Sequence, residues 1–430
     1  LLERVREGIV LHREGKLDDA RRIYKEVLAI QPCNASALNF LGVLAHQQHQ
    51  HPEAERLIAT AVVFDPQYVD AYNNLGNVFD EQGKTIEAGL CFQRALQIRP
   101  DFRPALMNLG VVLRRMRRLD DATRVFEGLL QDEPDDYEAL RNYGMVLLAK
   151  GEADRAVHQL RKAVQIKPCT ESRYAVGMAL YAADRLEEAG EIFLGWLEQE
   201  PDNPIAQHMA PAYVKQKHGT PARASDSYVR AIFDSFATSF ERVLEGLDYQ
   251  VPGMIGKVLQ ASYGDGHRNK VILDAGCGTG LCGLFLRPHA ARLVGVDLSP
   301  GMLAEARAAE NYDELVEAEL TEYLSAPGDR FDVVVAADAL CYFGSLETVF
   351  AGVASRLSPD GRFTFTLELL REAVPTGYRL NFHGRYSHTE DYVRQTLRGA
   401  GLRALSVDEC ELRMETGVPV VGLLVVCTRD

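Results

Sequence analysis

The sequence lacks the features of a membrane, extracellular or nucleic-acid-binding protein. It has no uninterrupted apolar segment of about 18 residues, which excludes a transmembrane helix from the expected elements. Its eight cysteines form no C-x-x-C pair, so we expect free thiols in a reducing cytoplasm rather than disulfides or a zinc site. The net charge of −14 supplies no basic face for phosphates, which argues against a nucleic-acid partner.

The length and composition predict several packed domains. The chain has 430 residues, of which 47% are apolar, and this length is typical of two to three domains. No signal-peptide pattern is present and no membrane partner is expected, so we predict a cytoplasmic protein. The first residue is Leu1 rather than methionine, and we expect the natural N-terminus to lie upstream.

The first half of the chain repeats with a period of 34 residues, shortened to 33 in the last interval. Prolines mark the period at positions 32, 66, 100, 134, 168 and 201. An alanine lies twelve residues before each proline, at positions 20, 54, 88, 122, 156 and 189. A glycine lies at positions 8, 42, 76, 110, 144 and 177. This period is typical of paired helices: the small residues allow close packing, and the proline ends the second helix.

These repeats resemble the tetratricopeptide repeat (TPR) family over residues 1–202. The resemblance implies an all-α solenoid with a concave groove. Residues 203–224 are expected to form a capping helix and a linker. In the groove, the recurring asparagines could bind an extended peptide backbone, or they could simply belong to a frequent Asn-Leu-Gly pattern. These asparagines are Asn74, Asn108 and Asn142.

A glycine-rich turn dominates the second half. The apolar run Val271–Ala275 leads into Gly276-Cys277-Gly278-Thr279-Gly280, and a second apolar run ends at Asp297. A strand that enters a glycine turn brings backbone N–H groups close to a ligand, and the acid at the end of the next strand accepts hydrogen bonds from ribose hydroxyls. The sequence therefore predicts a nucleotide-type site. Cys277 is interpreted as a small residue that fits the turn rather than as a nucleophile.

The spacing of the glycines favours one type of ligand. The dinucleotide fingerprint is G-x-G-x-x-G, whereas this turn is G-x-G-x-G with Asp274 ahead of it. An acid there would repel a pyrophosphate but suits a ligand with a cationic end. The turn and Asp297 resemble the S-adenosylmethionine (SAM) site of class I methyltransferases over residues 225–430. A nicotinamide-binding domain and a glycine turn without a ligand are the remaining alternatives.

The resemblance implies a seven-stranded, doubly wound α/β domain and its cofactor contacts. Strands are expected at 270–274, 292–297, 315–320, 331–338 and 361–368, followed by two strands at 402–412 and 418–428. The residues implied to contact SAM are Tyr228, Phe233, Phe236, Asp274, Gly276, Cys277, Gly278, Gly280, Asp297, Leu298, Met302, Glu319, Leu320, Ala337 and Asp338.

The aromatic segment at 227–241 has two interpretations. It could form a lid over the cofactor, because similar methyltransferases carry an F-D-x-x-A-x-x-F segment there, or an amphipathic helix packed on the sheet. A lid would exclude water from the site, which matters because charge disperses in the transition state.

The methyl acceptor requires a base only if it is protonated. Residues 381–388 contain the best candidates for this base, His388 and His383. In the same segment, Arg385 could bind an acidic acceptor. Tyr342 is expected to border the methyl-transfer point. His388 could instead cap the helix that follows it. No metal-ligand spacing is visible, so no metal is expected.

Three functions remain open at this stage. The first is a SAM-dependent methyltransferase acting on an O or N acceptor, in which the TPR half recruits a protein, peptide or carrier-bound substrate. The second is methylation of a free small molecule or sugar, with the repeats used for assembly. The third is an adaptor that keeps the SAM fold without catalysis. A nicotinamide oxidoreductase is disfavoured by the glycine spacing.

Overall fold

The computed structural model describes residues 1–213, 221–237, 240–264, 267–415 and 418–430, and it divides into two compact units. Unit 1 spans Leu1–Ala179 and unit 2 spans Leu180–Asp430. Part of the expected cap and linker, residues 214–220, lies outside the described residues, as do Thr238 and Ser239 of the expected lid. Within the described part of the chain, no helix combines the length and apolar content needed to cross a membrane.

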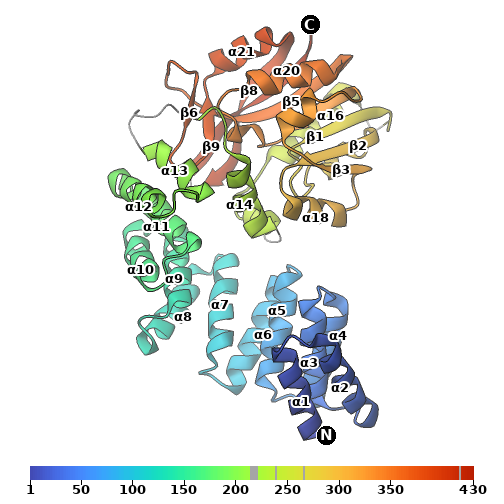
Figure 1. The fold of residues 1–430 in the computed structure, drawn as a ribbon, viewed down its shortest axis with the longest axis vertical. Coiled ribbons are helices and arrows are strands. Elements are labelled where there is room, and N and C mark those ends of the chain that lie inside the picture. Colours follow the sequence, from blue (N-terminus) through green and yellow to red (C-terminus); the bar gives the residue numbers. More distant parts are fainter. Residues whose placement is uncertain (214–220, 238–239, 265–266, 416–417) are drawn as a thin grey trace. The chain divides into compact units, whose positions relative to one another are not determined.

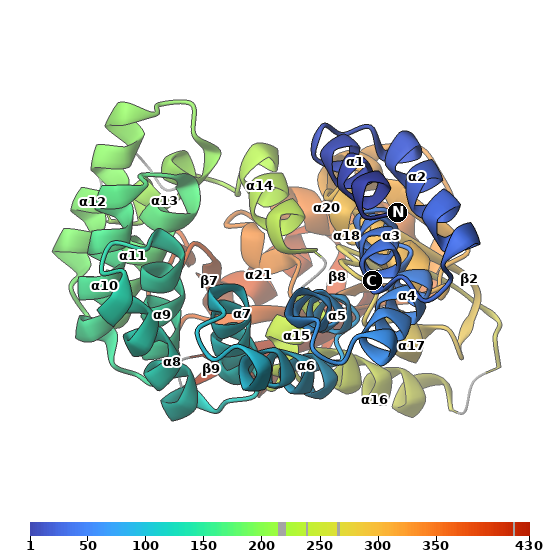
Figure 2. The same ribbon diagram turned by 90° about the horizontal axis from the view of Figure 1, so that it is seen from below.

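The repeats fold as successive helical pairs, which follow one another along a curved array (Figures 1 and 2). Each pair ends two residues before the repeat proline. The helices are α1 (Leu2–Arg13), α2 (Leu17–Ile30), α3 (Ala35–Gln47), α4 (His51–Phe64), α5 (Val69–Glu81), α6 (Thr85–Ile98), α7 (Arg103–Arg115), α8 (Leu119–Asp132), α9 (Tyr137–Ala149), α10 (Ala153–Ile166), α11 (Thr170–Ala182), α12 (Leu186–Gln199) and α13 (Pro204–Tyr213).

The small residues of the repeat allow the two helices of each pair to pack closely. A Cβ atom added at Gly42 would lie 2.4 Å from the Ile58 side chain, and one added at Gly76 would lie 2.5 Å from Phe92. The six repeat alanines are fully buried. The 34-residue pattern therefore arises because each helical pair packs so closely that only small side chains fit at these positions.

The repeat asparagines connect neighbouring repeats. The Asn74 amide donates to Asn39 Oδ1 at 3.0 Å, and the Asn108 amide donates to Asn73 Oδ1 at 3.1 Å and to Asn77 Oδ1 at 2.9 Å. Asn142 contacts Met107 Sδ at 3.7 Å. The amide nitrogens are thus used within the array, and peptide binding by these residues stays a prediction.

Unit 2 is built on a twisted sheet whose parallel core confirms the doubly wound prediction (Figure 1). The parallel strands lie in the order β3 (Glu314–Glu317), β2 (Ala290–Asp297), β1 (Lys270–Ala275), β4 (Phe331–Ala336) and β5 (Leu357–Leu369). Strand β9 (Val418–Arg429) pairs antiparallel with β5, and β8 (Leu402–Glu415) pairs antiparallel with β9.

Helices cover both faces of this sheet. Helices α19 (Leu320–Ser325), α20 (Glu347–Arg356) and α21 (Glu390–Gly399) contribute to one apolar core, and α16 (Val251–Tyr263) and α17 (Gly283–Leu286) contribute to the other. Residues of β1 and β4 alternate between the two cores, as expected for strands buried on both faces. The remaining elements are α14 (Asp226–Phe236), α15 (Phe240–Glu245), α18 (Pro300–Ala308) and the 3₁₀ turn η2 (Leu340–Tyr342).

The structure differs from the expected seven strands in two places. An additional hairpin, β6 (Tyr378–Leu380) and β7 (Tyr386–His388), joins the sheet through β5 and carries Arg385 in its turn region. The third strand ends at Glu317 because Glu319 caps α19 by accepting a hydrogen bond from Glu322 N at 2.9 Å. Leu320 therefore begins a helix rather than ending a strand.

Helix α13, expected as a cap of the repeats, packs within unit 2. His208 donates from Nε2 to the Gly384 carbonyl at 2.8 Å, and its ring stacks on Tyr228 with centroids 3.8 Å apart. The Tyr213 hydroxyl donates to the Phe382 carbonyl at 2.9 Å. The hairpin that carries Arg385 is thus held by the last helix of the repeat half.

Candidate active site

A cavity of about 290 Å³ lies at the carboxyl ends of β1, β2 and β4. Ligands bind at this edge in doubly wound sheets. All the residues expected to contact SAM line the cavity except Tyr228, which packs against His208, and Gly280, which lies beside Tyr312. Most of the predicted contact residues therefore lie on this cavity.

The glycine turn is tied to Asp297. Gly276, Gly278 and Gly280 have φ values of 77°, 55° and 92°, a backbone region that favours glycine. Gly278 N donates to Asp297 Oδ2 at 2.8 Å, and Ser299 N donates to Asp297 Oδ1 at 2.9 Å. The acid at the end of β2 thus fixes the turn as well as facing the cavity.

Two buried polar atoms of the turn have no hydrogen-bond partner. Asp274 accepts from the Tyr312 hydroxyl through Oδ2 at 2.7 Å, while its Oδ1 atom has no partner. Thr279 Oγ1 is also buried and unpartnered. Burial, opposed by the Tyr312 hydrogen bond and aided by the nearby Asp297 charge, raises the pKa of Asp274 to about 7. Such atoms fit a ligand that brings polar or cationic groups, as SAM does.

Cys277 does not have the surroundings of a nucleophile. Its side chain is buried, and burial raises the pKa of its thiol well above the ordinary value. A thiol held protonated is inert, which agrees with its interpretation as a small residue that fits the turn.

Aromatic side chains from α14 and α15 close one side of the cavity. Phe233 lies with its ring centroid 5.7 Å from Phe236, 5.9 Å from Phe240 and 5.3 Å from Tyr342. Asp234 Oδ1 accepts from Ser299 Oγ at 2.5 Å and from Gly301 N at 3.1 Å. These hydrogen bonds connect α14 to the start of α18 and hold the aromatic side chains of α14 beside the cavity.

Glu319 lines the cavity, and its carboxylate already accepts a hydrogen bond from the protein. Its Oε2 atom accepts from Glu322 N as the α19 cap, and Oε1 lies 3.9 Å from Arg223 Nη1. Met302 and Leu298 also line this part, so the side chains expected around the adenine lie together.

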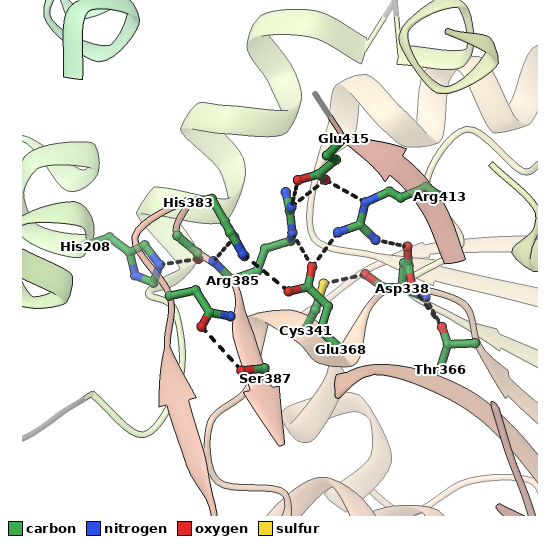
Figure 3. A network of polar contacts seen from close by, with 12 residues as sticks. His208, Asp338, Cys341, Thr366, Glu368, His383, Arg385, Ser387, Arg413 and Glu415 are labelled. Atoms are coloured by element: carbon green, nitrogen blue, oxygen red, sulfur yellow. Dashed lines mark hydrogen bonds and ion pairs between the residues drawn. The ribbon is translucent and has the colours of Figure 1, made fainter. Parts of the chain in front are cut away.

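The far end of the cavity holds a network of two arginines and three carboxylates (Figure 3). Arg413 on β8 donates from Nη1 to Asp338 at 2.8 Å, from Nε to Glu415 at 2.7 Å, and from Nη2 to Glu368. Arg385 donates from Nε to Glu368 at 2.7 Å and from Nη2 to Glu415 at 2.5 Å. Burial alone would raise the pKa of Glu368, but Arg385, His383 and Arg413 lower it to about 2.

Asp338 occupies a special backbone position in this network. Its φ is 50°, in the left-handed region that is uncommon for residues other than glycine. Asp338 N donates to Thr366 Oγ1, and Thr366 Oγ1 donates to Asp338 Oδ1, each at 2.9 Å. Thr366 therefore holds the carboxylate at the cavity.

The two candidate histidine bases do not line the cavity. His388 is fully buried and donates from Nε2 to the Gly344 carbonyl at 3.0 Å. His383 lies behind Arg385, with Nε2 3.5 Å from Glu368. Burial lowers the pKa of each to about 4, with Arg385 adding to the effect at His383. Tyr342 and Arg385, in contrast, line the cavity as expected.

Sequence reasoning missed several residues of the site. Arg413 and Glu415 come from the last hairpin, and Glu368 ends β5. A signal was present in Glu368, a charged residue at the end of an apolar strand, but no local pattern pairs it with residues so distant in sequence. Tyr312, Asp234 and Phe240 were also missed as site residues.

The described residues thus form a helical-repeat array followed by a doubly wound α/β domain, with a cavity beside the glycine turn. Comparisons with known proteins specify both halves. Residues 272–361 match the methyltransferase domain family, and residues 11–77, 69–102, 107–169 and 155–204 match tetratricopeptide repeat families. The chain therefore carries TPR repeats followed by a methyltransferase domain.

The similar proteins cover only part of this chain. A probable S-adenosylmethionine-dependent methyltransferase of Saccharomyces cerevisiae, CRG1, is 30% identical over 136 residues, 30% of this chain and 46% of its own length. Human methyltransferase-like protein 27 is 36% identical over 132 residues, 30% of this chain and 52% of its own length. The chain thus spans about half the length of these relatives.

Among solved structures, magnesium protoporphyrin IX methyltransferase from Synechocystis with bound SAM is 20% identical. The match covers 49% of this chain and 100% of that one, with a TM-score of 0.37.

Proposed function

We propose that the protein moves a methyl group from SAM to a nitrogen or oxygen atom of a substrate that the TPR half recruits as a protein, peptide or carrier-bound group. The observation that carries the proposal is one cavity lined at one end by the glycine turn and Asp274, whose Oδ1 atom has no partner among the described residues, and at the other end by an acid-rich network. When bound, SAM supplies a methyl group on a sulfonium, and positioning with exclusion of water can supply most of the rate.

The cofactor is assigned to the glycine-turn end. Asp297 would accept the ribose hydroxyls, and Asp274 Oδ1 would accept from the cationic amino group. Leu298 and Met302 would hold the adenine, with Glu319 accepting from its amine. Phe233, Phe236 and Phe240 would exclude water.

The charge of the network favours an acceptor that donates a hydrogen bond. The acids Asp338, Glu368 and Glu415 outnumber the two arginines, and the low pKa of His383 leaves it neutral at neutral pH. Burial raises the pKa of Asp338, which makes this carboxyl the best proton acceptor of the three. Each nitrogen of Arg413 is already bound to a carboxylate. An acceptor carboxylate would meet like charge here, whereas an amine or a hydroxyl could donate to Asp338. We therefore propose an amine or hydroxyl acceptor, with Asp338 holding its proton.

Recruitment by the repeats rests on the TPR matches, because TPR repeats generally mediate protein interactions. The close packing of α13 on the hairpin of Arg385 supports a link between the repeat half and the acceptor end of the cavity.

The test is transfer of labelled methyl from SAM into size-fractionated lysate, with Asp297→Ala as the inactive control. Label in macromolecules that resists mild base is expected, because N-methyl and ether bonds survive it and methyl esters do not. Base-labile label would refute the amine or hydroxyl acceptor, and label confined to small molecules would refute recruitment. Asp297→Ala should weaken SAM binding about 10–100-fold, since a charge-assisted hydrogen bond contributes about 1.5–3 kcal/mol.

A further inference from the structure

Two imidazoles and a carboxylate lie together where the end of α3, the start of α4 and the end of α5 meet. We propose that these three groups bind a divalent transition-metal ion. Their ligand atoms, from His46, His51 and Glu81, all lie within 4.8 Å of one another. The sequence predicts no metal here, because Glu81 belongs to the next repeat and no local spacing connects it to the histidines.

The fold determines this arrangement. His46 lies in the last turn of α3, His51 is the first residue of α4, and Glu81 is the last residue of α5. Because the chain reverses between α3 and α4, the two rings face each other with centroids 5.8 Å apart. The stacking of the next repeat then brings the carboxylate to both rings.

The ring nitrogens that face the carboxylate lack hydrogen-bond partners. His46 Nε2 lies 2.8 Å from Glu81 Oε2 and His51 Nδ1 lies 3.9 Å from the same atom. Both nitrogens are buried, and neither has hydrogen-bond geometry to any group of the described residues. A simple His–Glu ion pair would engage one ring and leave the other nitrogen buried without a partner, whereas a shared cation would use all three groups.

The donor set suits zinc and its neighbours. Two imidazoles and one carboxylate form a known three-ligand zinc set that leaves a fourth position open, and imidazole is also a good ligand for copper and nickel. With bonds of about 2.0–2.1 Å, tetrahedral ligand atoms lie roughly 3.3 Å apart. The observed separations of 2.8 and 3.9 Å lie on either side of that value, so small side-chain rotations are sufficient.

An ion here would join two repeats. In a solenoid each repeat contacts only its neighbours, so a bond from the α3–α4 turn to α5 adds directly to the interface between them. The bound ion would stabilise the folded array, and the stabilisation would rise with the logarithm of the ratio of its concentration to its dissociation constant.

The test uses the full-length protein after treatment with a chelator. Zn²⁺ is titrated by calorimetry, and Co²⁺ is added separately because its visible absorption reports coordination geometry and distinguishes histidine from thiolate ligands. The variants are His46→Ala/His51→Ala and Glu81→Gln. The control is His158→Ala, which removes an exposed histidine of α10 in the same unit.

The wild type and His158→Ala should bind one Zn²⁺ ion with histidine-type Co²⁺ absorption and a metal-dependent rise in Tm. The double variant should lose that site, and Glu81→Gln should bind about tenfold more weakly or worse. Circular dichroism without metal checks that the variants fold, and Glu81→Gln keeps the test valid if the double variant does not. Equal zinc stoichiometry and affinity in all four proteins, or thiolate-type absorption alone, would overturn the proposal.

Discussion

Asp274 should make the affinity for SAM depend on pH, and Asp274→Asn should remove that dependence. Burial holds the pKa of this carboxyl at about 7, and its Oδ1 atom has no hydrogen-bond partner in the part of the chain that the structure describes. A cationic amino group of the cofactor would bind the ionised carboxylate and not the neutral acid. Each binding event at acidic pH must therefore release a proton.

The expected size of the effect follows from the ionised fraction. A group with a pKa of about 7 is about half ionised at pH 7 and about 3% ionised at pH 5.5, so the apparent affinity should rise about fifteenfold over this interval. An α-amino group, with a pKa of about 8, stays protonated throughout. Asp274→Asn should bind about 10–100-fold more weakly at pH 7, with no pH dependence.

The assay is calorimetric titration of SAM between about pH 5.5 and 7, in two buffers of different ionisation enthalpy that count the released protons. Tyr312→Phe is the matched variant, because it removes the hydrogen bond that lowers the pKa of Asp274 and should move the profile to higher pH. A constant wild-type affinity, or the same slope in Asp274→Asn, would refute the assignment of the cationic end to this carboxylate.

The same carboxyl should affect unfolding. Its folded-state pKa lies above the unfolded value of about 3.9, so its contribution to stability is complete below about pH 4 and is lost as pH rises through 7. The loss is at most about 4 kcal/mol for a shift of about 3 units. In the absence of SAM, urea unfolding should give Asp274→Asn a smaller loss of stability than the wild type between pH 4 and 7.5.

Three further predictions concern the repeats. Residues 219–430 alone should bind SAM but lose turnover on the natural substrate. A longer fragment, residues 183–430, restores α12 and α13 and should recover the part of the activity that depends on the contacts of α13 with the Arg385 hairpin. Full activity of residues 219–430 would contradict both substrate recruitment by the repeats and support of the hairpin by α13. Gly76→Ala should lower the stability of unit 1 by about 1–2 kcal/mol, because the added Cβ atom would collide with Phe92. Gly128→Ala should raise it by up to about 1 kcal/mol, because no atom lies within 4 Å of the added Cβ atom and alanine favours a helix. Thermal unfolding of the two variants and the wild type measures both changes. Replacing the three repeat asparagines (Asn74, Asn108 and Asn142) together with alanine should weaken partner capture in a pull-down and leave the SAM affinity unchanged. Unaltered capture would refute a peptide-binding role for these asparagines.

The sequence predicted the parts of this protein that local patterns encode. The repeat glycines and alanines predicted the helical pairs, because the same steric requirement recurs every 34 residues. Gly276, Gly278 and Asp297 predicted the cofactor end, because a glycine turn and the acid of the next strand lie on adjacent parallel strands.

The acceptor end could not be predicted in the same way. Arg413 meets Glu368 and Asp338 because β9 pairs antiparallel with both β5 and β8 and so places β8 one strand away from β5. No pattern near Arg413 in the sequence indicates this pairing. His388 was a reasonable candidate from its position beside a polar segment. Its strand β7, however, pairs with β5 and turns the ring into the protein, where it bonds Gly344.

The division of the chain inside its last repeats has a consequence for how such proteins can diversify. Unit 2 begins at Leu180 and includes α12 and α13, and α13 donates two of the hydrogen bonds that hold the Arg385 hairpin. Whole repeats ahead of them could be gained or lost as interchangeable segments without altering a residue of the cavity. If the repeats recruit the substrate as proposed, the length of the array and the chemistry of the cavity could then be selected independently.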